Sequence, residues 1–531
     1  MISKKTNKKI TLGQYYTSSD VANFMIDLSD KSKSSKVLES GFGNGVFIES
    51  LLQKGFVDIK GYDIDEENCE LVKKLFKNRV KIECSDYLQT PSSEKFDLII
   101  GNPPYVHWNN IQKKIRNKLS EDTFWKSYSN GEWDLLYAFI IWSVEKLNNE
   151  GELIYIVPYN WFNSTNASSL RQYLVEKGEF EIICHFGELK LFRDCYPNNI
   201  IFKYRKTKMK NKKPIYISEY SATRGNISQI LLDIKKDFKN INNPSYHSES
   251  ENLRVYTSCQ FGSEKFWYLA TNREKKQLER IEKSSQMIKL SDYLDIGVGI
   301  VSGFDQAFRI EHSEIPSFSE SEKKLLKSFV KSINCQRYFI NSASYYIFAD
   351  EIKTEDNLKK YPKIYDRLLK YRHELDSRYI SKNKNWWNWA TIRNEQLFIK
   401  SLDKPKIFVP CIDRNLKSRF SYTENQYLGS GDVLVIIPKQ NLKEDLLYIL
   451  AWLNSDVINF WYQIKGAHTG KRIRYTQSYV SQIPLRLIDW NNQKEIKIYE
   501  SIIEKTKKLI KSKSSMEYEK EINYMISKLI L

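Results

Sequence analysis

The sequence predicts an α/β protein, with a doubly wound and largely parallel sheet in its N-terminal half and a second domain of α+β character. Short apolar runs alternate with helical patterns from residue 37 to residue 157. The run FDLIIG is apolar almost throughout, as is typical of strands buried on both faces of a sheet. A polar tract at residues 233–252 then divides the chain, so we expect domains at residues 1–245 and 246–531.

The expected elements follow one another in a βαβ rhythm. A helix at residues 20–29 begins at an aspartate and carries apolar residues at helical spacing. Strands are expected at residues 37–38, 59–64, 80–83, 96–100 and 151–157, and helices at residues 46–52, 66–76 and 135–147. Residues 199–204 and 215–217 flank the lysine-rich tract KTKMKNKK, which we expect to be the solvated tip of a hairpin.

The second half of the chain mixes aromatic-rich short segments with basic helices and contains no repeat, so we expect one α+β domain there. Trp386, Trp387 and Trp389 have a spacing that favours a place in the core over a wedge between bases. The segment GVGIVSG lacks the Lys-Ser/Thr pair that would follow a phosphate-binding loop.

Composition narrows the class of partner. Among 531 residues, 83 Lys and Arg stand against 65 Asp and Glu, so the net charge is +18. This excess favours a polyanion such as nucleic acid, although a lysine-rich proteome would produce it too. No apolar run approaches the roughly 18 residues of a membrane span, and the start lacks a secretory core, so we expect a cytoplasmic protein without a membrane partner. The 7 Cys and 6 His show no metal-ligand spacing, and no metal is expected.

A glycine-rich turn follows the first expected strand in VLESGFGNGVF and leads into a helix. Such a turn lets the backbone approach a nucleotide or nucleoside beside a helix N-terminus, although tight packing alone can also require it. Asp63 and Asp65 lie at the end of the next strand, about 20 residues on, where an acid can accept hydrogen bonds from ribose hydroxyls. Asp86 and Tyr87 follow the third strand and could bind an adenine amine and stack on its ring.

The tetrapeptide Asn102-Pro103-Pro104-Tyr105 directly follows the buried strand FDLIIG. The exocyclic amine of adenine is a poor nucleophile because its lone pair is delocalised into the ring. The Asn102 side-chain oxygen and the Pro103 carbonyl can accept its two N–H groups, and two prolines fix φ and hold that carbonyl in place. Tyr105 offers a flat face on which an extruded base can stack.

With these motifs in this order, the chain resembles S-adenosylmethionine-dependent DNA methyltransferases that act on the N6 amine of adenine, of the gamma, TaqI-like arrangement. The resemblance implies a Rossmann-like methyltransferase sheet with a target-recognition domain after it. It implies Asn102, Pro103, Pro104 and Tyr105 as catalytic residues, and Tyr105 and Tyr196 against the flipped base. The S-adenosylmethionine site that it implies consists of Tyr16, Thr17, Glu39, Ser40, Gly41, Gly43, Asp63, Ile64, Asp86, Tyr87 and Asn102.

One basic segment in the second domain could follow DNA phosphates. Residues 465–475 include glycines and carry Lys465, Lys471, Arg472 and Arg474. Such contacts would position double-stranded DNA and make its binding sensitive to salt, whereas a merely solvated charged face would do neither.

Several alternatives share the same catalytic motif. Methylation of a protein glutamine uses NPPY too, and RNA adenine and cytosine N4 pose the same chemical problem. A basic domain after the catalytic half favours DNA over a protein substrate. Cytosine C5 methylation is disfavoured because the Pro410-Cys411 pair lies far from the cofactor motifs. We expect a monomeric modification enzyme, with any cognate restriction endonuclease encoded separately.

Overall fold

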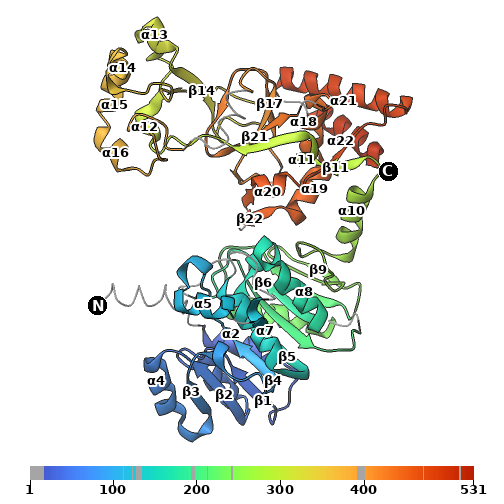
Figure 1. The fold of residues 1–531 in the computed structure, drawn as a ribbon. Coiled ribbons are helices and arrows are strands. Elements are labelled where there is room, and N and C mark those ends of the chain that lie inside the picture. Colours follow the sequence, from blue (N-terminus) through green and yellow to red (C-terminus); the bar gives the residue numbers. More distant parts are fainter. Residues whose placement is uncertain are drawn as a thin grey trace. The chain divides into compact units, whose positions relative to one another are not determined.

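The structure is a computed structural model, and it describes residues 17–111, 113–121, 123–126, 134–192, 198–211, 213–240, 243–391, 401–415, 417–439, 441–469, 472–513 and 516–530. The chain divides into two compact units, Met1–Lys275 and Lys276–Leu531 (Figure 1). None of the helices in the described ranges combines the length and the apolar character that a membrane span requires.

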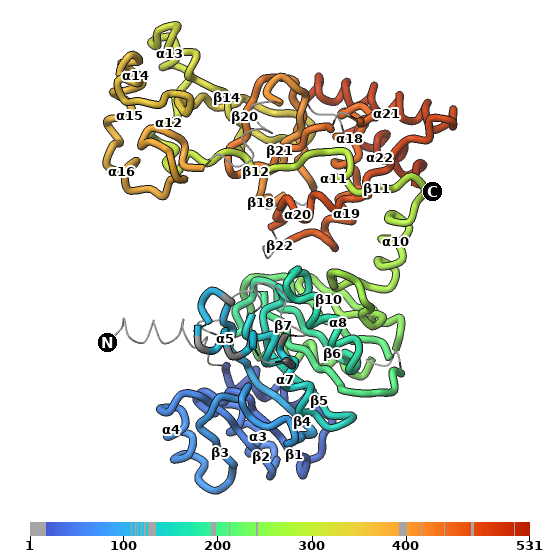
Figure 2. Tube along the Cα trace, in the orientation of Figure 1, coloured from blue at the N-terminus to red at the C-terminus, as the bar shows by residue number. Residues whose placement is uncertain are grey.

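A ten-stranded sheet in the order β3-β2-β1-β4-β5-β7-β6-β8-β10-β9 forms the centre of the first unit (Figure 2). The five strands from β3 to β5 pair in parallel, which confirms the doubly wound sheet. The bounds are β1 Lys36–Glu39, β2 Asp58–Asp63, β3 Lys81–Cys84, β4 Phe96–Gly101, β5 Leu147–Pro158, β6 Gly178–His185, β7 Asn199–Lys206, β8 Ile215–Tyr220, β9 His247–Glu249 and β10 Leu253–Ser258.

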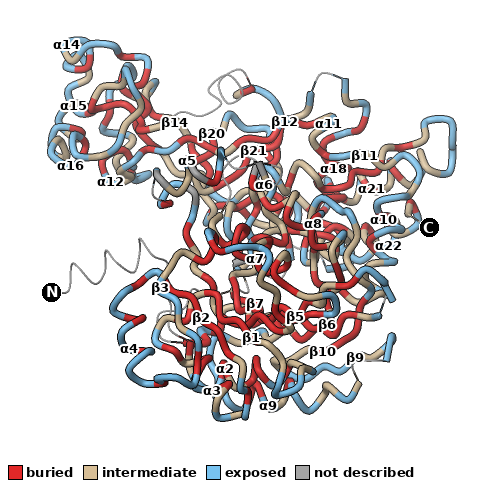
Figure 3. Tube along the Cα trace, turned by 60° about the horizontal axis from the view of Figure 1, so that its bottom comes forward, coloured by how far each residue is buried: buried red, intermediate tan, exposed pale blue. Residues whose placement is uncertain are grey.

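Helices cover both faces of this sheet. One apolar core unites the inner sides of α2, α3, α4 and α9 with the sheet, and a second core unites α7 and α8 with it. Figure 3 shows the buried strands between helices whose outer turns are exposed. The bounds are α2 Ser19–Asp27, α3 Val46–Gln53, α4 Glu66–Phe76, α5 Lys113–Glu121, α6 Thr123–Lys126, α7 Leu135–Lys146, α8 Ser168–Lys177 and α9 Ile227–Lys236; α10, Asn272–Lys283, runs from the first unit into the second.

The predicted hairpin between β7 and β8 is wrong. Strand β7 pairs antiparallel with β5 and with β6, and β8 pairs in parallel with β6, so β6 separates the two strands that flank the lysine-rich tract. The reason is the apolar content of β6, whose Phe180 and Ile183 are 3% and 0% exposed and belong to the sheet's core. Neighbours along the chain are therefore not neighbours in the sheet.

Strands β9 and β10 extend the same sheet beyond the expected end of the catalytic domain. β10 pairs antiparallel with β8 along its whole length, and β9 pairs with β10. The compact units consequently part after Lys275, later in the chain than the boundary expected after residue 245.

The second unit has the expected mixture of short strands and helices. Its sheets have the orders β11-β24, β12-β21-β17-β19-β15, β13-β16-β14-β20 and β18-β23-β22. The strands are β11 Met287–Lys289, β12 Leu294–Val298, β13 Arg309–Ile310, β14 Leu326–Val330, β15 Tyr338–Phe339, β16 Ser344–Ile347, β17 Lys406–Pro410, β18 Ile412–Asp413, β19 Ser421–Thr423, β20 Leu428–Gly429, β21 Val433–Pro438, β22 Ala467–Thr469, β23 Arg472–Arg474 and β24 Pro484–Arg486.

Three tryptophans contribute to one core in this unit. Trp386, Trp387 and Trp389 are 7%, 4% and 1% exposed, which confirms their predicted place in the core. The helices are α11 Leu290–Tyr293, α12 Asp305–Phe308, α13 Glu320–Lys323, α14 Glu355–Lys359, α15 Pro362–Leu369, α16 Arg372–Ser377, α18 Leu446–Leu453, α19 Asp456–Lys465, α20 Gln477–Val480, α21 Gln493–Ser512 and α22 Met516–Ile530.

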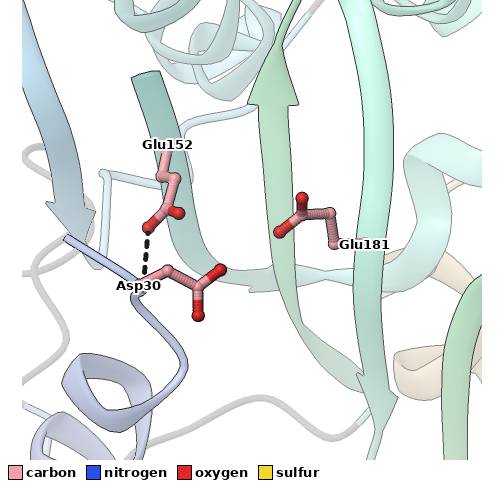
Figure 4. A group of neighbouring side chains, drawn as sticks. All are labelled: Asp30, Glu152 and Glu181. Carbon is pink, nitrogen blue, oxygen red and sulfur yellow. Dashed lines mark hydrogen bonds between the residues drawn. The ribbon is translucent and has the colours of Figure 1, made fainter. Parts of the chain in front are cut away.

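Three carboxylates, Asp30, Glu152 and Glu181, approach one another beside β5, β6 and β7 (Figure 4). Their spacing would suit a cation, but the Lys203 ammonium already lies 2.6, 3.3 and 2.9 Å from oxygens of the three. The Arg205 guanidinium also forms ion pairs with all of them. The group is therefore a salt-bridge network that joins the loop after α2 to the sheet.

The network is deeply buried at its centre, where the side chains of Glu152 and Lys203 are 0% and 3% exposed. Burial alone would raise the pKa of Glu181, but hydrogen bonds and charge from Arg205 and Lys203 hold that pKa below its usual value. The cations are thus what allows the carboxylates to stay charged in the interior.

Replacing the central lysine should cost much stability. We expect Lys203→Met to lower the free energy of unfolding by about 3–5 kcal/mol, because it leaves buried carboxylates short of a cation. Urea denaturation of the full chain measures this change. Lys208→Met, at an exposed position of the lysine-rich tract, is the matched control, and adding Glu152→Gln to Lys203→Met should recover part of the loss. A Lys203→Met midpoint equal to that of the control would contradict the network's role.

Candidate active site

The predicted motifs meet at one edge of the first sheet. Glu39 ends β1, Asp63 ends β2, and Asn102 follows Gly101 at the end of β4. Strand β1 lies between β2 and β4, and Glu39 pairs with Gly61 on one side and Ile100 on the other. Because these strands are parallel, their carboxyl ends share an edge, which is where ligands bind in open α/β sheets.

The glycine-rich turn between β1 and α3 is fastened to β2. The Gly43 N–H donates to the Asp63 carboxylate at 2.7 Å. Gly45, at φ 84°, adopts the left-handed conformation that turns the chain into α3. A Cβ placed on Gly41 would meet no atom within 4 Å, so the backbone at Gly41 borders open space. The turn is thus fixed to β2 at Gly43 and borders open space at Gly41.

Glu39 is a buried carboxyl with an unused acceptor. Its side chain is 1% exposed, and its Oε2 has no hydrogen-bond partner among the described residues. Burial, and then the negative charge of Asp63, raise the pKa of Glu39 well above its ordinary value. An acceptor that is buried without a donor is costly and marks a place where a ligand can supply one.

Asp63 and Ile64 present different surfaces at the end of β2. The Asp63 carboxylate also accepts the Asp65 N–H at 2.8 Å, and burial raises the pKa of Asp63 although these backbone donors oppose it. Ile64 is 52% exposed. A fixed carboxylate beside an exposed apolar side chain can bind the hydroxyls of a ribose and the face of a base.

Tyr87 does not take the stacking position that the sequence suggested. Its ring is 2% exposed and packs against Tyr62 and Phe139, with ring centroids 5.9 and 5.4 Å away. Its hydroxyl pairs with Ser143 at 3.0 Å, so the ring has a complete set of core contacts. Asp86 caps the short helix that Tyr87 begins, because its Oδ1 accepts the Leu88 N–H at 3.1 Å.

A buried chain of hydroxyl groups, which the sequence did not predict, runs behind the turn. Ser40 pairs with Tyr155 at 2.6 Å, and Tyr155 pairs with Ser143 at 2.6 Å, which connects to Tyr87. The Ser40 hydroxyl is thus directed into the interior, which leaves its backbone to contact a ligand. Tyr155 pairs with Gly101 of β4 in the sheet, whereas Ser143 lies on α7, and their proximity appears only in the fold.

The NPPY segment adjoins β5. The Tyr105 hydroxyl donates to the Ile156 carbonyl at 2.7 Å and also bonds Asn102 Oδ1. The Asn102 amide Nδ2 donates to Thr17 Oγ1 at 3.1 Å. Pro103 is buried, whereas Pro104 and the Tyr105 ring are half-buried. Of the predicted site residues, Tyr16, Tyr196 and Lys471 lie outside the described residues.

Two family models match this chain. Residues 22–192 match the Eco57I restriction-modification methylase family, and residues 331–485 match the TaqI-like C-terminal specificity domain. The type II methyltransferases M.HindII and M.HincII, both of Haemophilus influenzae, are each 32% identical to this chain, and each alignment covers 98% of both proteins. The chain belongs to the type II methyltransferases of restriction-modification systems. The type IIL restriction-modification enzyme MmeI, solved in complex with DNA, shares the fold, with a TM-score of 0.61, 13% identity, and coverage of 99% of this chain and 76% of that one.

This type II methyltransferase acts on DNA and takes its methyl group from S-adenosylmethionine. The residues present fit that cofactor. The unpartnered Glu39 oxygen can accept from a cationic, hydrogen-rich methionine end, and the open backbone at Gly41 leaves room beside it. Asp63 and Ile64 match a ribose and an adenine.

The basic segment of the type II methyltransferase's second unit separates into two kinds of residue. Lys465 is committed to an ion pair within the unit, with its Nζ 2.6 and 2.8 Å from the two carboxylate oxygens of Glu282. Arg472 and Arg474 lie on β23, which pairs with β22 and β18, and Arg474 is exposed. The pair with Glu282 makes Lys465 a weaker candidate for contact with DNA than Arg474.

Removing the buried charge of Glu39, at the carboxyl end of β1, should stabilise the cofactor-free enzyme. Because the pKa of Glu39 is raised on folding, its contribution to stability is full below about pH 4.5 and is lost as the pH rises through the folded-state pKa. We expect the Tm of Glu39→Gln to exceed that of the wild type at pH 8, by about 2–4 °C for each kcal/mol gained in the free energy of unfolding. Near pH 4 the two Tm values should be equal. Differential scanning calorimetry without cofactor measures this. Glu49→Gln, at an exposed site on α3, is the control, and a Glu39→Gln advantage independent of pH would contradict the assignment.

Proposed function

We propose that the enzyme methylates N6 of an adenine in double-stranded DNA and that the adenine is rotated out of the duplex to react. The observation that carries this proposal is the NPPY segment at the end of β4, with the amide of Asn102 placed between Thr17 and Tyr105. The match of the second half to a TaqI-like specificity domain supports DNA over RNA or protein as the substrate.

In the proposed mechanism the protein binds and orients the amine. Asn102 Oδ1 and the Pro103 carbonyl accept the two N6 hydrogens, which draws the nitrogen toward tetrahedral geometry and frees its lone pair. S-adenosylmethionine, when bound, supplies an electrophilic methyl carbon. The N6 lone pair would form the new N–C bond as the S–C bond of the donor breaks, and the resulting cationic amine would then lose a proton to water. We therefore assign no dedicated general base.

Tyr105 has a second role in this proposal, as the platform for the target base. Stacking on an aromatic ring contributes about 1–3 kcal/mol per base, comparable with the few kcal/mol that extrusion from the duplex costs. We propose Tyr196 as a further contact of the flipped base. The cofactor would lie against Tyr16, Thr17, Glu39, Ser40, Gly41, Gly43, Asp63, Ile64, Asp86, Tyr87 and Asn102. Ser40 and Tyr87 would act through their backbones, and Thr17 through atoms other than its hydroxyl, which bonds Asn102.

We also propose that the enzyme acts as a monomer and protects DNA from a separately encoded restriction endonuclease. A single asymmetric specificity domain is sufficient to recognise one site, and the matched family belongs to restriction-modification systems. Analytical sedimentation of the enzyme bound to duplex DNA gives the mass of the complex and so tests whether one copy of the enzyme binds each site.

The asparagine variant tests the reaction and the base together. We expect Asn102→Ala to lower kcat by about 10²–10³-fold while cofactor affinity stays within a few-fold of the wild type. Plasmid from a methylation-free bacterial host that expresses either protein is analysed by single-molecule sequencing and nucleoside mass spectrometry. Asn78→Ala, at an exposed asparagine, is the matched control.

N6-methyladenine at one short motif in the wild type, lost in Asn102→Ala, is the expected result. N4-methylcytosine in its place would overturn the adenine assignment but keep the role of Asn102. Unchanged turnover in Asn102→Ala would rule out that role.

Salt dependence tests the basic segment. The slope of log K against log salt is negative, and each lost phosphate contact should make it less negative by about 0.9. We expect Arg474→Gln, alone or with Arg472→Gln, to make the slope for duplex DNA less steep, whereas Lys465→Gln should leave it unchanged because Lys465 pairs with Glu282. Fluorescence anisotropy with a labelled duplex at several salt concentrations measures the slopes. Equal slopes for wild type and both arginine variants would show that the segment is only a solvated face.

A further inference from the structure

The amide of Asn102 is bonded on both sides, by two hydroxyl groups from different parts of the first unit. Thr17 Oγ1 lies 3.1 Å from Nδ2, and the Tyr105 hydroxyl bonds Oδ1. Thr17 is 7% exposed and lies 85 residues before Asn102 in the chain. The hydroxyl of Thr17 is therefore engaged with the catalytic loop.

Thr17 is held in place by the helix that it precedes. Helix α2 begins at Ser19, and its Val21 and Met25 are 0% exposed in the core beneath the sheet. Asp20, in the first turn of α2, accepts a hydrogen bond from Ser228 of α9. A hydroxyl at the start of an anchored helix is a firm partner for a side chain on a loop.

The proposed chemistry requires a definite orientation of the amide. The terminal torsion of asparagine is broad, so an unrestrained amide can turn over and present NH₂ where oxygen is needed. An NH₂ group facing the target amine would place donor against donor. Tyr105 alone restrains the amide weakly, because its single hydroxyl proton faces two acceptors, Asn102 Oδ1 and the Ile156 carbonyl.

We propose that Thr17 is a positioning residue for methyl transfer. Its hydroxyl holds the Asn102 amide in the orientation in which Oδ1 accepts the hydrogen of the target amine. Family resemblance places Thr17 beside the cofactor, whereas its hydroxyl in this structure faces the catalytic asparagine. The inference rests on the proposed role of Asn102.

Two substitutions separate the hydroxyl from the bulk of the side chain. Thr17→Val keeps the shape and removes the hydroxyl, and Thr17→Ser keeps the hydroxyl. We expect Thr17→Val to lower kcat by about 10–100-fold, as small misplacements of catalytic groups do, and Thr17→Ser to restore kcat to within about threefold of the wild type. KM for DNA, and the Kd for S-adenosylmethionine measured by calorimetry, should stay within about twofold. Thr207→Val, at a buried threonine that bonds Met209, is the control.

The double variant gives an independent test. If Thr17 acts through Asn102, Thr17→Val should cost nothing further in an Asn102→Ala background. A full additional loss there would overturn the inference. Weaker S-adenosylmethionine binding in Thr17→Val, in proportion to the loss of turnover, would make Thr17 a cofactor ligand and overturn it as well. Equal kcat values for Thr17→Val and the wild type would also overturn the inference.

These outcomes are distinct from failure of the proposed function. The product of the wild-type enzyme identifies the methylated base without reference to Thr17. A cytosine N4 product would correct the base while the Thr17 measurements remain valid, because that amine requires the same acceptor.

Discussion

The site depends on the point at which β4 stops and β5 continues. The two strands pair in parallel as far as Gly101 and Tyr155, and β5 then runs on to Pro158. Pro103 and Pro104 have no N–H to donate, so the chain after Asn102 cannot extend the ladder. A buried backbone carbonyl left without a donor is costly, and here the Tyr105 hydroxyl supplies one to Ile156. The same two prolines thus end the strand and create the loop. The unpaired β5 carbonyl then draws Tyr105 back against the sheet and fixes the course of that loop beside the cofactor edge.

Electrostatics at this edge favours binding over stability. Glu39 and Asp63 lie on adjacent strands, both buried, and the charge of Asp63 makes ionisation of Glu39 harder. Elsewhere in the same unit, Lys203 and Arg205 compensate the equally buried carboxylate of Glu152, so the fold is capable of neutralising a buried acid. Among the described residues Glu39 Oε2 has no hydrogen-bond donor. A ligand with positive charge and hydrogen-bond donors would offset the free-energy cost of burying the Glu39 carboxyl. Such a cost in the free protein is expected where function rather than stability has shaped a site.

Sequence patterns predicted what is local and missed what is not. Strand-end motifs were placed correctly because parallel strands must bring their carboxyl ends to one edge. Strand β6 was missed, and the adjacent hairpin mispredicted, because pairing out of chain order leaves no local signal. The position of Asp86 and Tyr87 after the third strand did not reveal that the Tyr87 ring enters the core, where Ser143 on α7 meets its hydroxyl. The topology of the second unit was likewise beyond local patterns, although its buried tryptophans were recognised by their spacing.

The net charge predicted a polyanionic partner, but ion pairs within the protein decide which cations can contact DNA. Many of the arginines and lysines in the second unit are occupied by the fold itself: Arg337 pairs with Glu519 at 3.0 Å, Arg486 with Glu495 at 2.8 Å, and Lys465 with Glu282. Glu282, the partner of Lys465, lies 183 residues away in the chain. The sequence of the basic segment alone therefore gives no sign of this ion pair and predicts that Lys465 contacts DNA. A charge held in a partly buried ion pair cannot leave for a phosphate without stranding its carboxylate. The electrostatic footprint for DNA must therefore come from cations such as Arg474 that remain exposed, because each ion pair removes one cation and one acid and leaves the excess of +18 unchanged.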